Sequence, residues 1–414
     1  MKSTVRRRFR RAPAVVAALG SLLLIGGAIA PAAAADTMRD REWYLDRMQA
    51  GEMWKVSTGK GITVALLDTG VIPSVPELTG KVLAGKNFVE PELGAHKDSD
   101  GHGTAMAMLI AGNGANGQGV KGLAPDARIL PLTVFGSTKE SGTNSVPALV
   151  AAIRYAADSE AKIINMSLAY ESFALDEDEQ TSLQEAVDYA VKRGKLLLAG
   201  TGNRGDKGNR AAYPAASLGV AGVGAVDKTS SVTKFSVSGS QVALAAPGED
   251  IPILCGGGTP GYCTSWGTSQ ATAITSASAA LIWSKHPSWT GNQVLRVLMN
   301  TAGKPTEGKV PSRYIGYGTV RPRLAVLGDP GDPGPADVNP LVAARSPKSP
   351  SPSAPSGSAG PTTPAEQSAS PAASAKTDEG KGTGAIVWIA VGVGVVVVIG
   401  AVLLLRRRTA GTRH

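Results

Sequence analysis

The stretch ITVALLDTGV, residues 62–71, opens on a short apolar run, 62–67, that is followed by an acidic residue. An apolar run of this length without regular polar alternation is expected of a β-strand covered on both faces. Three further runs share this character: 129–135, 163–168 and 196–199. The sequence therefore predicts several buried strands.

The segments between and after these runs place apolar residues at three- and four-residue intervals, which is typical of amphipathic helices. These segments are 148–157, 183–191, 273–283 and 294–298. Strands that alternate with helices predict an α/β fold with a mainly parallel central sheet and helices on both sides. In such folds ligands gather at the carboxyl ends of the strands, where we expect a functional site.

The chain has 414 residues, 42 Lys plus Arg against 33 Asp plus Glu, and two cysteines. Its length predicts an ordinary hydrophobic core, and its cysteine count excludes a small disulfide-built scaffold. Six basic residues lie among the first eleven positions and four among the last nine, so the formal net charge of +9 belongs to the ends. Without a basic field over its body, the protein is expected to bind no nucleic acid.

Both ends of the chain carry membrane signals. Residues 1–35 combine a basic start, an apolar run and a small-residue end, which predicts a secretory signal peptide and a mature start at Asp36. An uncleaved N-terminal anchor is the alternative. Residues 385–405 form an uncharged run long enough to cross a bilayer as one transmembrane helix.

The orientation of this helix follows from the basic tail, 406–414, which begins with three arginines. Basic residues next to a membrane span favour the cytoplasmic side, so we expect a single-pass cell-membrane protein with its C-terminus in the cytoplasm. Residues 329–384 are rich in Pro, Ser and Ala and predict a disordered linker, because they cannot bury enough surface to offset the entropy of ordering. The expected folded part is 36–328, outside the cell.

Candidate catalytic residues lie where the fold expectation places them. Among the four histidines, His102 stands in the glycine-rich turn DGHGT before a helical pattern. Asp68 ends the first strand, where a partly buried carboxylate needs a partner. Ser269 lies in GTSQA at the start of a helix. It is either an N-cap or a nucleophile whose oxyanion the helix amides stabilise.

Three motifs in this order, ALLDTGV (65–71), DGHGTAMA (100–107) and GTSQATA (267–273), resemble those of subtilisin-type serine proteases. The resemblance implies a subtilisin-like three-layer fold and an endopeptidase that acts on protein or peptide substrates without a required cofactor. It assigns Asp68, His102 and Ser269 to a catalytic triad. His102 would take the Ser269 proton during attack, and Asp68 would orient His102.

Two further stretches are similar to the family, and they imply the substrate cleft. The segment GTGN implies that Asn203 is the oxyanion asparagine, and INMSL implies the strand that pairs with a peptide. The implied substrate-binding residues are Ser167, Leu168, Ala169, Gly200, Thr201 and Gly202. Ala169 replaces a frequent glycine, which should narrow the pocket, whereas Ala105 and Ala273 replace a histidine and a proline that take no part in the chemistry.

The architecture around the protease motifs is similar to that of mycosins, membrane-anchored proteases associated with type VII secretion in actinobacteria. About 25 residues between the expected signal cleavage site and the first strand leave no room for a folding pro-domain. The resemblance implies a type VII secretion membrane complex as partner. A largely non-catalytic scaffold for that complex is the alternative. We expect residues 36–54 to wrap the domain, because this segment is too short to fold as an inhibitor.

Cys255 and Cys263 flank a short glycine-rich loop, and outside the cell such a pair predicts a disulfide, with two free thiols as the alternative. Two cysteines without matched histidines predict no structural zinc, and we expect no metal in the active site. The acidic run from Asp176 to Glu179 is expected to be a solvated loop, with structural calcium as the alternative.

Overall fold

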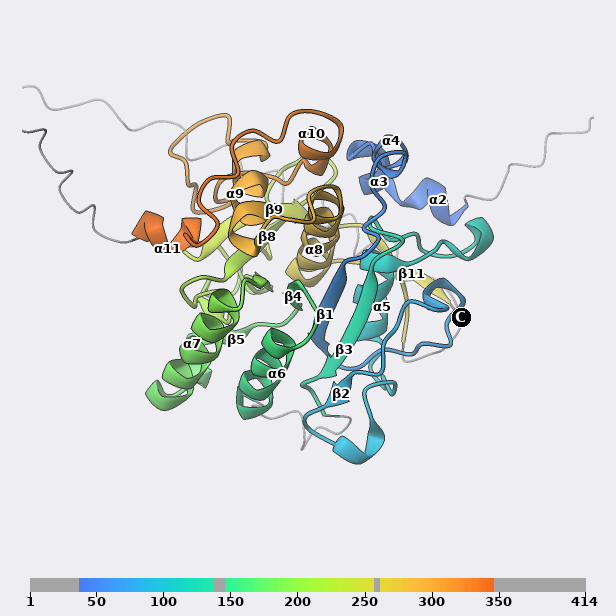
Figure 1. Ribbon diagram of the computed structural model, residues 1–414, viewed down its shortest axis with the longest axis horizontal. Helices are drawn as coiled ribbons and strands as arrows, with labels where there is room; N and C mark the ends of the chain where they lie inside the picture. The colour runs from blue at the N-terminus through green and yellow to red at the C-terminus, as the bar shows by residue number, and fades with distance from the viewer. Residues whose placement is uncertain (1–36, 137–145, 257–260, 346–414) are drawn as a thin grey trace, which may run out of the picture. The chain divides into compact units, whose positions relative to one another are not determined.

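The computed structural model describes residues 37–136, 146–256 and 261–345 (Figure 1). Seven strands of this part form one sheet in the order β2-β3-β1-β4-β6-β8-β9, and each neighbouring pair is parallel. These strands are β1 Thr63–Asp68, β2 Lys86–Asn87, β3 Arg128–Thr133, β4 Ile163–Met166, β6 Leu196–Gly200, β8 Ala221–Val226 and β9 Val242–Pro247. The four expected strands are confirmed as β1, β3, β4 and β6.

Helices cover both faces of the sheet (Figure 1). Val64 and Leu66 of β1 belong to one hydrophobic core and Ala65 and Leu67 to a second core, because successive side chains of a strand point to opposite faces. The first core contains residues of α5 His102–Ala111, α8 Thr268–Lys285, α9 Gly291–Thr301 and α10 Pro322–Leu327, and the second contains residues of α6 Val146–Asp158 and α7 Glu177–Lys192. The expected three-layer α/β fold is confirmed.

Helix α8 lies inside the first core, with nearly all residues from Thr268 to Trp283 buried. Several of its hydroxyl groups donate to carbonyls one turn earlier, as Thr275 does to Ala271 and Ser278 does to Ile274, each at 2.8 Å. Small residues let this helix pack closely against several strands. The structure therefore fixes the first residues of α8 firmly at the sheet edge.

Strand β1 lies between β3 and β4, and the chain proceeds outward from it in both directions. Such a reversal of strand order leaves a crevice beyond the carboxyl ends of the central strands. In the register of β1 and β4, Leu67 pairs with Met166. Asp68 and Ser167 consequently leave the sheet side by side.

Helix α7 begins with the acidic run that we expected to be a loop. Asp176 is its N-cap: the Asp176 carboxylate accepts the Glu179 amide at 2.8 Å, and the Glu179 carboxylate accepts the Asp176 amide at 3.1 Å. Acidic groups also suit the positive end of the helix dipole. The loop expectation was wrong, because these residues were assigned by charge and their capping pattern was overlooked.

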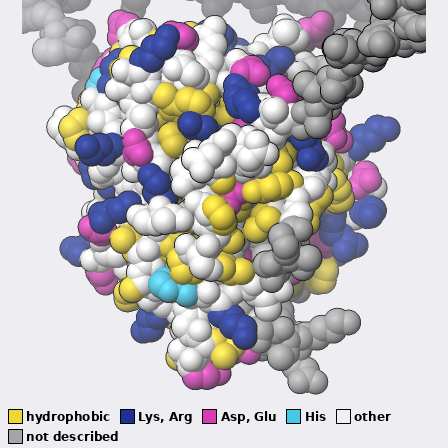
Figure 2. All heavy atoms as spheres, turned by 90° about the vertical axis from the view of Figure 1, so that its right-hand side faces the viewer, with side chains coloured by type: hydrophobic (Ala, Val, Ile, Leu, Met, Phe, Trp, Pro, Cys, Tyr) yellow, Lys and Arg dark blue, Asp and Glu magenta, His cyan; other side chains and the backbone are white. Residues whose placement is uncertain are grey.

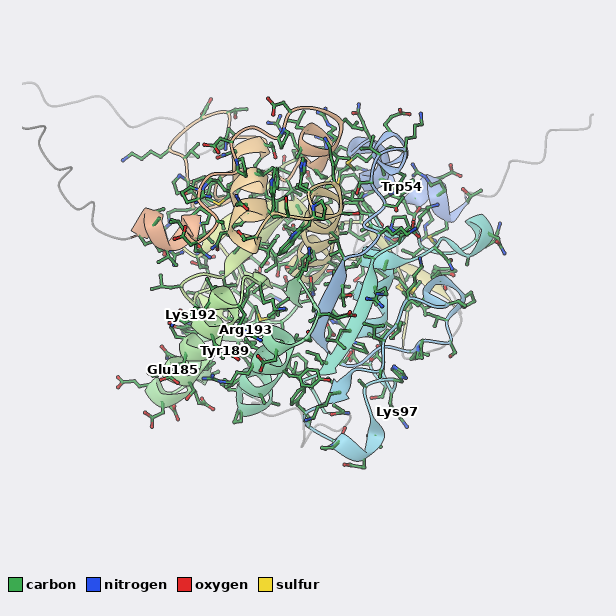
Figure 3. All side chains as sticks on the ribbon, viewed as in Figure 1. Trp54, Lys97, Glu185, Tyr189, Lys192 and Arg193 are labelled. Carbon is green, nitrogen blue, oxygen red and sulfur yellow. A yellow bond between two sulfur atoms is a disulfide. The ribbon has the colours of Figure 1, made fainter. Side chains whose placement is uncertain are left out.

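Exposed polar pairs join α7 to α6, and Figure 3 labels the α7 members Glu185, Tyr189 and Arg193. The Tyr189 hydroxyl donates to Asp158 at 2.6 Å, and an Arg193 nitrogen lies 3.3 Å from the same carboxylate. A looser ion pair joins Glu185 to Arg154 at 3.6 Å. Exposed pairs of this kind contribute little, roughly 0–1 kcal/mol each, so the apolar faces of these helices hold them in place.

The N-terminal segment wraps the domain as expected. It forms three short helices, α2 Met38–Arg41, α3 Trp43–Arg47 and α4 Ala50–Trp54. Tyr44, Leu45 and Met53 are fully buried in the first core. The indole of Trp54 (labelled in Figure 3) donates to the Leu123 carbonyl at 2.9 Å. This segment is thus part of the folded body.

The folded part extends past residue 328, where we expected the linker to begin. Residues 329–345 lie against the body and end in the helix α11, Pro340–Arg345. Arg296 of α9 donates to the carbonyls of Pro333 at 2.7 Å and Val338 at 2.9 Å. A proline-rich chain offers carbonyls but few amides, and the side chain of α9 supplies the missing donors. Composition alone did not reveal this partner.

Two small antiparallel ribbons complete the structure: β5 Tyr170–Glu171 with β7 Ala212–Tyr213, and β10 Ile251–Leu254 with β11 Tyr262–Ser265. The expected disulfide between Cys255 and Cys263 is present beside the second ribbon. The expected signal peptide, 1–35, and transmembrane helix, 385–405, lie outside the described residues. Within the described ranges, no helix has the length and apolar character needed to cross a bilayer.

Candidate active site

Asp68 and His102 meet at the carboxyl edge of the sheet. Asp68 is the last residue of β1 and is 1% exposed, and His102 is the first residue of α5. The His102 Nδ1 atom donates to Asp68 Oδ1 at 2.6 Å. This bond leaves the other ring nitrogen, Nε2, free to act on a substrate.

The electrostatic surroundings of His102 favour its charged form. Burial acts to lower the pKa of the imidazole, but the nearby carboxylates of Asp68, Asp100 and Asp98 outweigh it and raise the pKa of His102 to about 9. An imidazole accepts a proton only when neutral. His102 is therefore expected to act as a base mainly at alkaline pH.

Asp98 organises this corner, although the sequence did not single it out. It is 3% exposed, and its Oδ1 accepts hydrogen bonds from the Gly101 amide and the Thr69 hydroxyl, both at 2.8 Å. Its Oδ2 accepts the amide and hydroxyl of Thr104 at 2.8 and 2.6 Å. One buried carboxylate thus ties the end of β1 to the start of α5, which holds His102 against Asp68.

The close approach of these two elements requires a glycine after His102. A Cβ atom on Gly103 would lie 2.1 Å from the Gly70 carbonyl oxygen and 3.2 Å from the Asp68 Cβ. Both distances are shorter than ordinary van der Waals contacts, and the first involves backbone that cannot rotate away. Gly103 of the DGHG motif is therefore a steric requirement of the Asp68–His102 contact.

Ser269 is the second residue of α8, close to the helix amides. Its hydroxyl donates to the Ser167 carbonyl at 3.1 Å, and the Ser167 hydroxyl donates to the Ser269 carbonyl at 3.0 Å. No hydrogen bond joins Ser269 to His102 in the described residues, so the hydroxyl must rotate before it can give its proton to the imidazole. Catalytic hydrogen bonds are often incomplete until a substrate is bound.

Asn203 is oriented by the residue before Ser269. Its side-chain oxygen accepts the Thr268 amide at 2.8 Å and the Thr268 hydroxyl at 3.0 Å. With the oxygen held in this way, the amide nitrogen remains to donate elsewhere. The arrangement supplies a preorganised donor next to the Ser269 end of α8, as an oxyanion site requires.

A cavity of about 390 Å³ brings most of the expected substrate-binding residues together. Ser167, Leu168, Ala169 and Gly202 line it, as do Asn203, Thr268 and Ser269. Gly200 and Thr201 do not line this cavity, because both are buried behind its wall. A Cβ on Gly200 would contact Thr268, and the methyl group of Thr201 faces Gly222. Glu171, Arg204 and Arg210 also line it, and sequence reasoning did not assign them a role.

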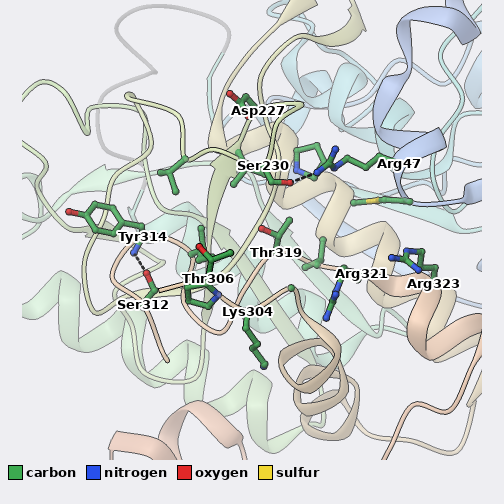
Figure 4. Close-up of a pocket in the computed structure, with 18 of the residues that line it drawn as sticks. Arg47, Asp227, Ser230, Lys304, Thr306, Ser312, Tyr314, Thr319, Arg321 and Arg323 are labelled. Atoms are coloured by element: carbon green, nitrogen blue, oxygen red, sulfur yellow. Dashed lines mark hydrogen bonds between the residues drawn. The ribbon is translucent and has the colours of Figure 1, made fainter. Parts of the chain in front are cut away.

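A larger cavity of about 600 Å³ lies between the N-terminal segment and the chain around 303–323, and it includes none of the candidate catalytic residues (Figure 4). Three of the four cations that line it are engaged by the protein itself. Lys304 donates to the Met299 carbonyl, Arg321 to the Thr301 carbonyl and Arg47 to the Lys228 carbonyl. These bonds give Arg47, Lys304 and Arg321 a structural explanation. Of these two cavities, Ser269 lines only the smaller one, which is therefore the candidate active site.

Comparison with known proteins agrees with this geometry. Residues 59–318 match the model of the Subtilase family. The chain belongs to the subtilase family. This subtilase is 38% identical over 242 residues to the major intracellular serine protease of Bacillus subtilis, an alignment that covers 57% of this chain and 72% of the relative. It is 36% identical to subtilisin E of the same species over 59% of this chain and 61% of that protein.

The subtilase is also similar in structure to mycosins. MycP1 from Mycobacterium smegmatis superposes with a TM-score of 0.63 at 29% identity, covering 73% of this chain and 88% of that chain. The MycP3 protease from the type VII (ESX-3) secretion system superposes with a TM-score of 0.60 at 30% identity, covering 69% and 87%. The chain is thus a subtilisin-like serine protease with mycosins among its structural neighbours.

Proposed function

We propose that this subtilase hydrolyses peptide bonds by acyl transfer, with Ser269 as nucleophile and His102 as general base. The observation that carries the proposal is the 2.6 Å hydrogen bond between Asp68 and His102. This bond lies at the carboxyl edge of the sheet, next to the end of β4. Ser167 follows β4 and lines the same cavity as Ser269. Asp68 would hold the His102 ring and stabilise its charged form during the reaction.

The reaction would proceed in two steps. The Ser269 oxygen attacks the scissile carbonyl while His102 Nε2 takes its proton, and the tetrahedral oxyanion accepts hydrogen bonds from Asn203 Nδ2 and the Ser269 amide. His102 then gives the proton to the leaving amine. A water molecule then attacks the acyl-enzyme carbonyl while His102 takes its proton. His102 returns this proton to the Ser269 oxygen, and the carboxylic acid product leaves. No metal or cofactor enters these steps.

We further propose that the protease is anchored in the cell membrane with its catalytic domain outside and serves a type VII secretion system. The signal-peptide pattern of residues 1–35 and the apolar run 385–405 with its basic tail support the anchoring. The structural similarity to MycP1 and MycP3 supports the role in secretion. The proposal predicts that a protease added outside intact cells removes the catalytic domain and leaves the tail protected.

Labelling with a fluorophosphonate probe tests the chemistry. The full chain should form an adduct on Ser269 alone, as mapped by mass spectrometry, and Ser269→Ala should form none. Asn203→Ala should still fold but lose turnover by about 10²- to 10³-fold, the loss observed for the oxyanion asparagine of a subtilisin. A folded chain that forms no adduct would contradict the proposal and favour a scaffold role.

A further inference from the structure

Three charged side chains line the cavity beside Ser269: Glu171, Arg204 and Arg210. Two of them neutralise each other: the Arg204 Nε atom lies 2.9 Å from Glu171 Oε1. The Glu171 side chain is 22% exposed, whereas that of Arg204 is 64% exposed. This pair closes part of the cavity wall and adds no net charge to it.

The third charged residue, Arg210, has no carboxylate partner among the described residues. Its guanidinium lies over the ring of Phe173, 5.0 Å from the ring centroid. A cation–π contact of this kind leaves the charge and the N–H donors of the guanidinium available, and both side chains are exposed to solvent. The lining of the cavity therefore carries one uncompensated positive charge.

An apolar neck lies beside Gly202 in the lining of this cavity. A Cβ on Gly202 would lie 3.2 Å from Val237, 3.7 Å from Ala169 and 3.8 Å from Ala212, so these three side chains converge at this point. Ala212 pairs with Glu171 across the β5–β7 ribbon, so the neck lies next to the ion pair of Glu171 with Arg204. A side chain that fills the cavity must be slender at its base.

We propose that this cavity selects an acidic residue, glutamate above all, immediately before the scissile bond, with Arg210 as the residue that binds its carboxylate. The inference rests on the proposed function of Ser269. The two methylenes of glutamate fit the apolar neck, and its carboxylate reaches a guanidinium able to donate two parallel hydrogen bonds. A lysine in the same place would bring two like charges together in a partly enclosed site.

Four peptide substrates that differ only in the residue before the scissile bond test the inference on the full chain. Glutamate and glutamine have the same shape, so their ratio of kcat/KM isolates the charge. We expect glutamate to exceed glutamine by at least about tenfold, which corresponds to about 1.4 kcal/mol, with leucine between them and lysine last. The ratio should fall as salt is added. Equal values for glutamate and glutamine would overturn the inference.

Substitutions at Arg210 sharpen the test. Arg210→Gln should bring the glutamate and glutamine values together, and Arg210→Glu should place lysine above glutamate. Lys207→Gln is the matched control. Lys207 lies in the same loop between β6 and β7 and carries the same charge, but it does not line the cavity, so this variant should keep the glutamate preference. Retained preference in Arg210→Gln would overturn the inference.

Probe labelling separates this inference from the proposed function. A wild-type chain that labels on Ser269 but shows no glutamate preference overturns the specificity alone. A folded wild-type chain that neither labels nor cleaves any of the four peptides overturns the proposed chemistry, and the specificity with it. Labelling of Arg210→Gln at the wild-type rate would show that the variant retains its fold and its activated serine.

Discussion

Ser167 and Ser269 hold each other reciprocally, since each hydroxyl donates to the backbone carbonyl of the other at 3.0 and 3.1 Å. The Ser167 hydroxyl oxygen also accepts a hydrogen bond from the Asn165 side-chain amide at 2.9 Å. The side-chain oxygen of Asn165 in turn accepts the Ser276 hydroxyl at 2.8 Å. This chain of bonds crosses from the end of β4 to α8. It connects the substrate-side strand to the nucleophile through buried polar groups.

Ser167→Ala should therefore lower stability without removing the nucleophile. The substitution leaves the fully buried Asn165 amide without its acceptor, and we expect a loss of about 1–3 kcal/mol in the free energy of unfolding. Denaturant unfolding measures this loss, and probe labelling on Ser269 should persist. Ser99→Ala, at an exposed position, is the control and should be close to neutral.

Gly103→Ala should separate His102 from Asp68. The added methyl group would lie 2.1 Å from the Gly70 carbonyl oxygen, so α5 must shift away from β1. We expect a fall in kcat/KM of at least about 10²-fold and a measurable loss of stability. Gly51→Ala is the matched control: it lies in α4 with no heavy atom within 4 Å of its Cβ, and it should gain up to about 1 kcal/mol. Equal activity in both variants would contradict the steric argument.

The activity should depend on pH through His102, whose pKa is raised to about 9. Because the base must be neutral, kcat/KM of the free enzyme should rise with pH toward this value. Asp100→Asn removes one carboxylate that raises the pKa of His102, so the acidic limb of the profile should move to lower pH. Asp178→Asn, on α7, should leave the limb in place. A profile that is the same in Asp100→Asn and wild type would refute the attribution.

Glu42 should make the fold less stable in neutral solution than in mild acid. Burial is the main cause that raises the pKa of Glu42 to about 7, from 4.5. The folded state then binds more protons than the unfolded state between these values, so the contribution of this group to stability falls as pH rises from 4.5 to about 7. Glu42→Gln should abolish this fall, because its side-chain oxygen can still accept the Lys121 amide. The exposed Glu52→Gln should preserve it, as thermal unfolding at pH 5 and pH 8 would show.

The segment after residue 328 should contribute to stability. A domain truncated after Gly328 should unfold at lower denaturant concentration than one that ends at Arg345. Within the longer domain, Arg296→Met removes donors to the Pro333 and Val338 carbonyls and should cost about 1–3 kcal/mol. Arg193→Met removes only an exposed ion pair and should change stability by less than about 0.5 kcal/mol. Indistinguishable unfolding of the two truncations would contradict the packing described here.

The sequence predicted those elements whose cause is local. The runs that form β1, β4 and β6 are apolar because helices cover both faces of the sheet. The glycine-rich turn around His102 reflects the close approach of β1 and α5. Strand β8, AGVGAV, escaped prediction because glycine and alanine carry little β-propensity; it is a strand because β6 and β9 lie on either side of it.

Other features depend on partners far away in the chain. Asp98 accepts from Thr69, which lies 29 positions earlier, so its role is visible only once β1 and α5 are assembled. The ion pair of Glu171 with Arg204 likewise joins residues brought together by the β5–β7 ribbon and the end of β6. Periodicity and motif spacing contain no information about such contacts.

Charge offers a final comparison between sequence and structure. The face shown in Figure 2 carries Lys and Arg interspersed with Asp and Glu, without a broad surface of one sign. A phosphate backbone requires an extended positive surface. The mixed charges of this face offer no such surface.

The position of the N-terminal segment constrains the order in which the domain can be completed. Helix α4 packs against α10, and the Ser57 hydroxyl donates to the Leu281 carbonyl at 2.7 Å across 224 residues. During synthesis the N-terminal helices are made first, but they cannot pack until α8 and α10, near the end of the domain, have been made. Folding is therefore expected to be slow and to finish only after the whole domain has been made, because contacts between its two ends cannot form while the later end is missing.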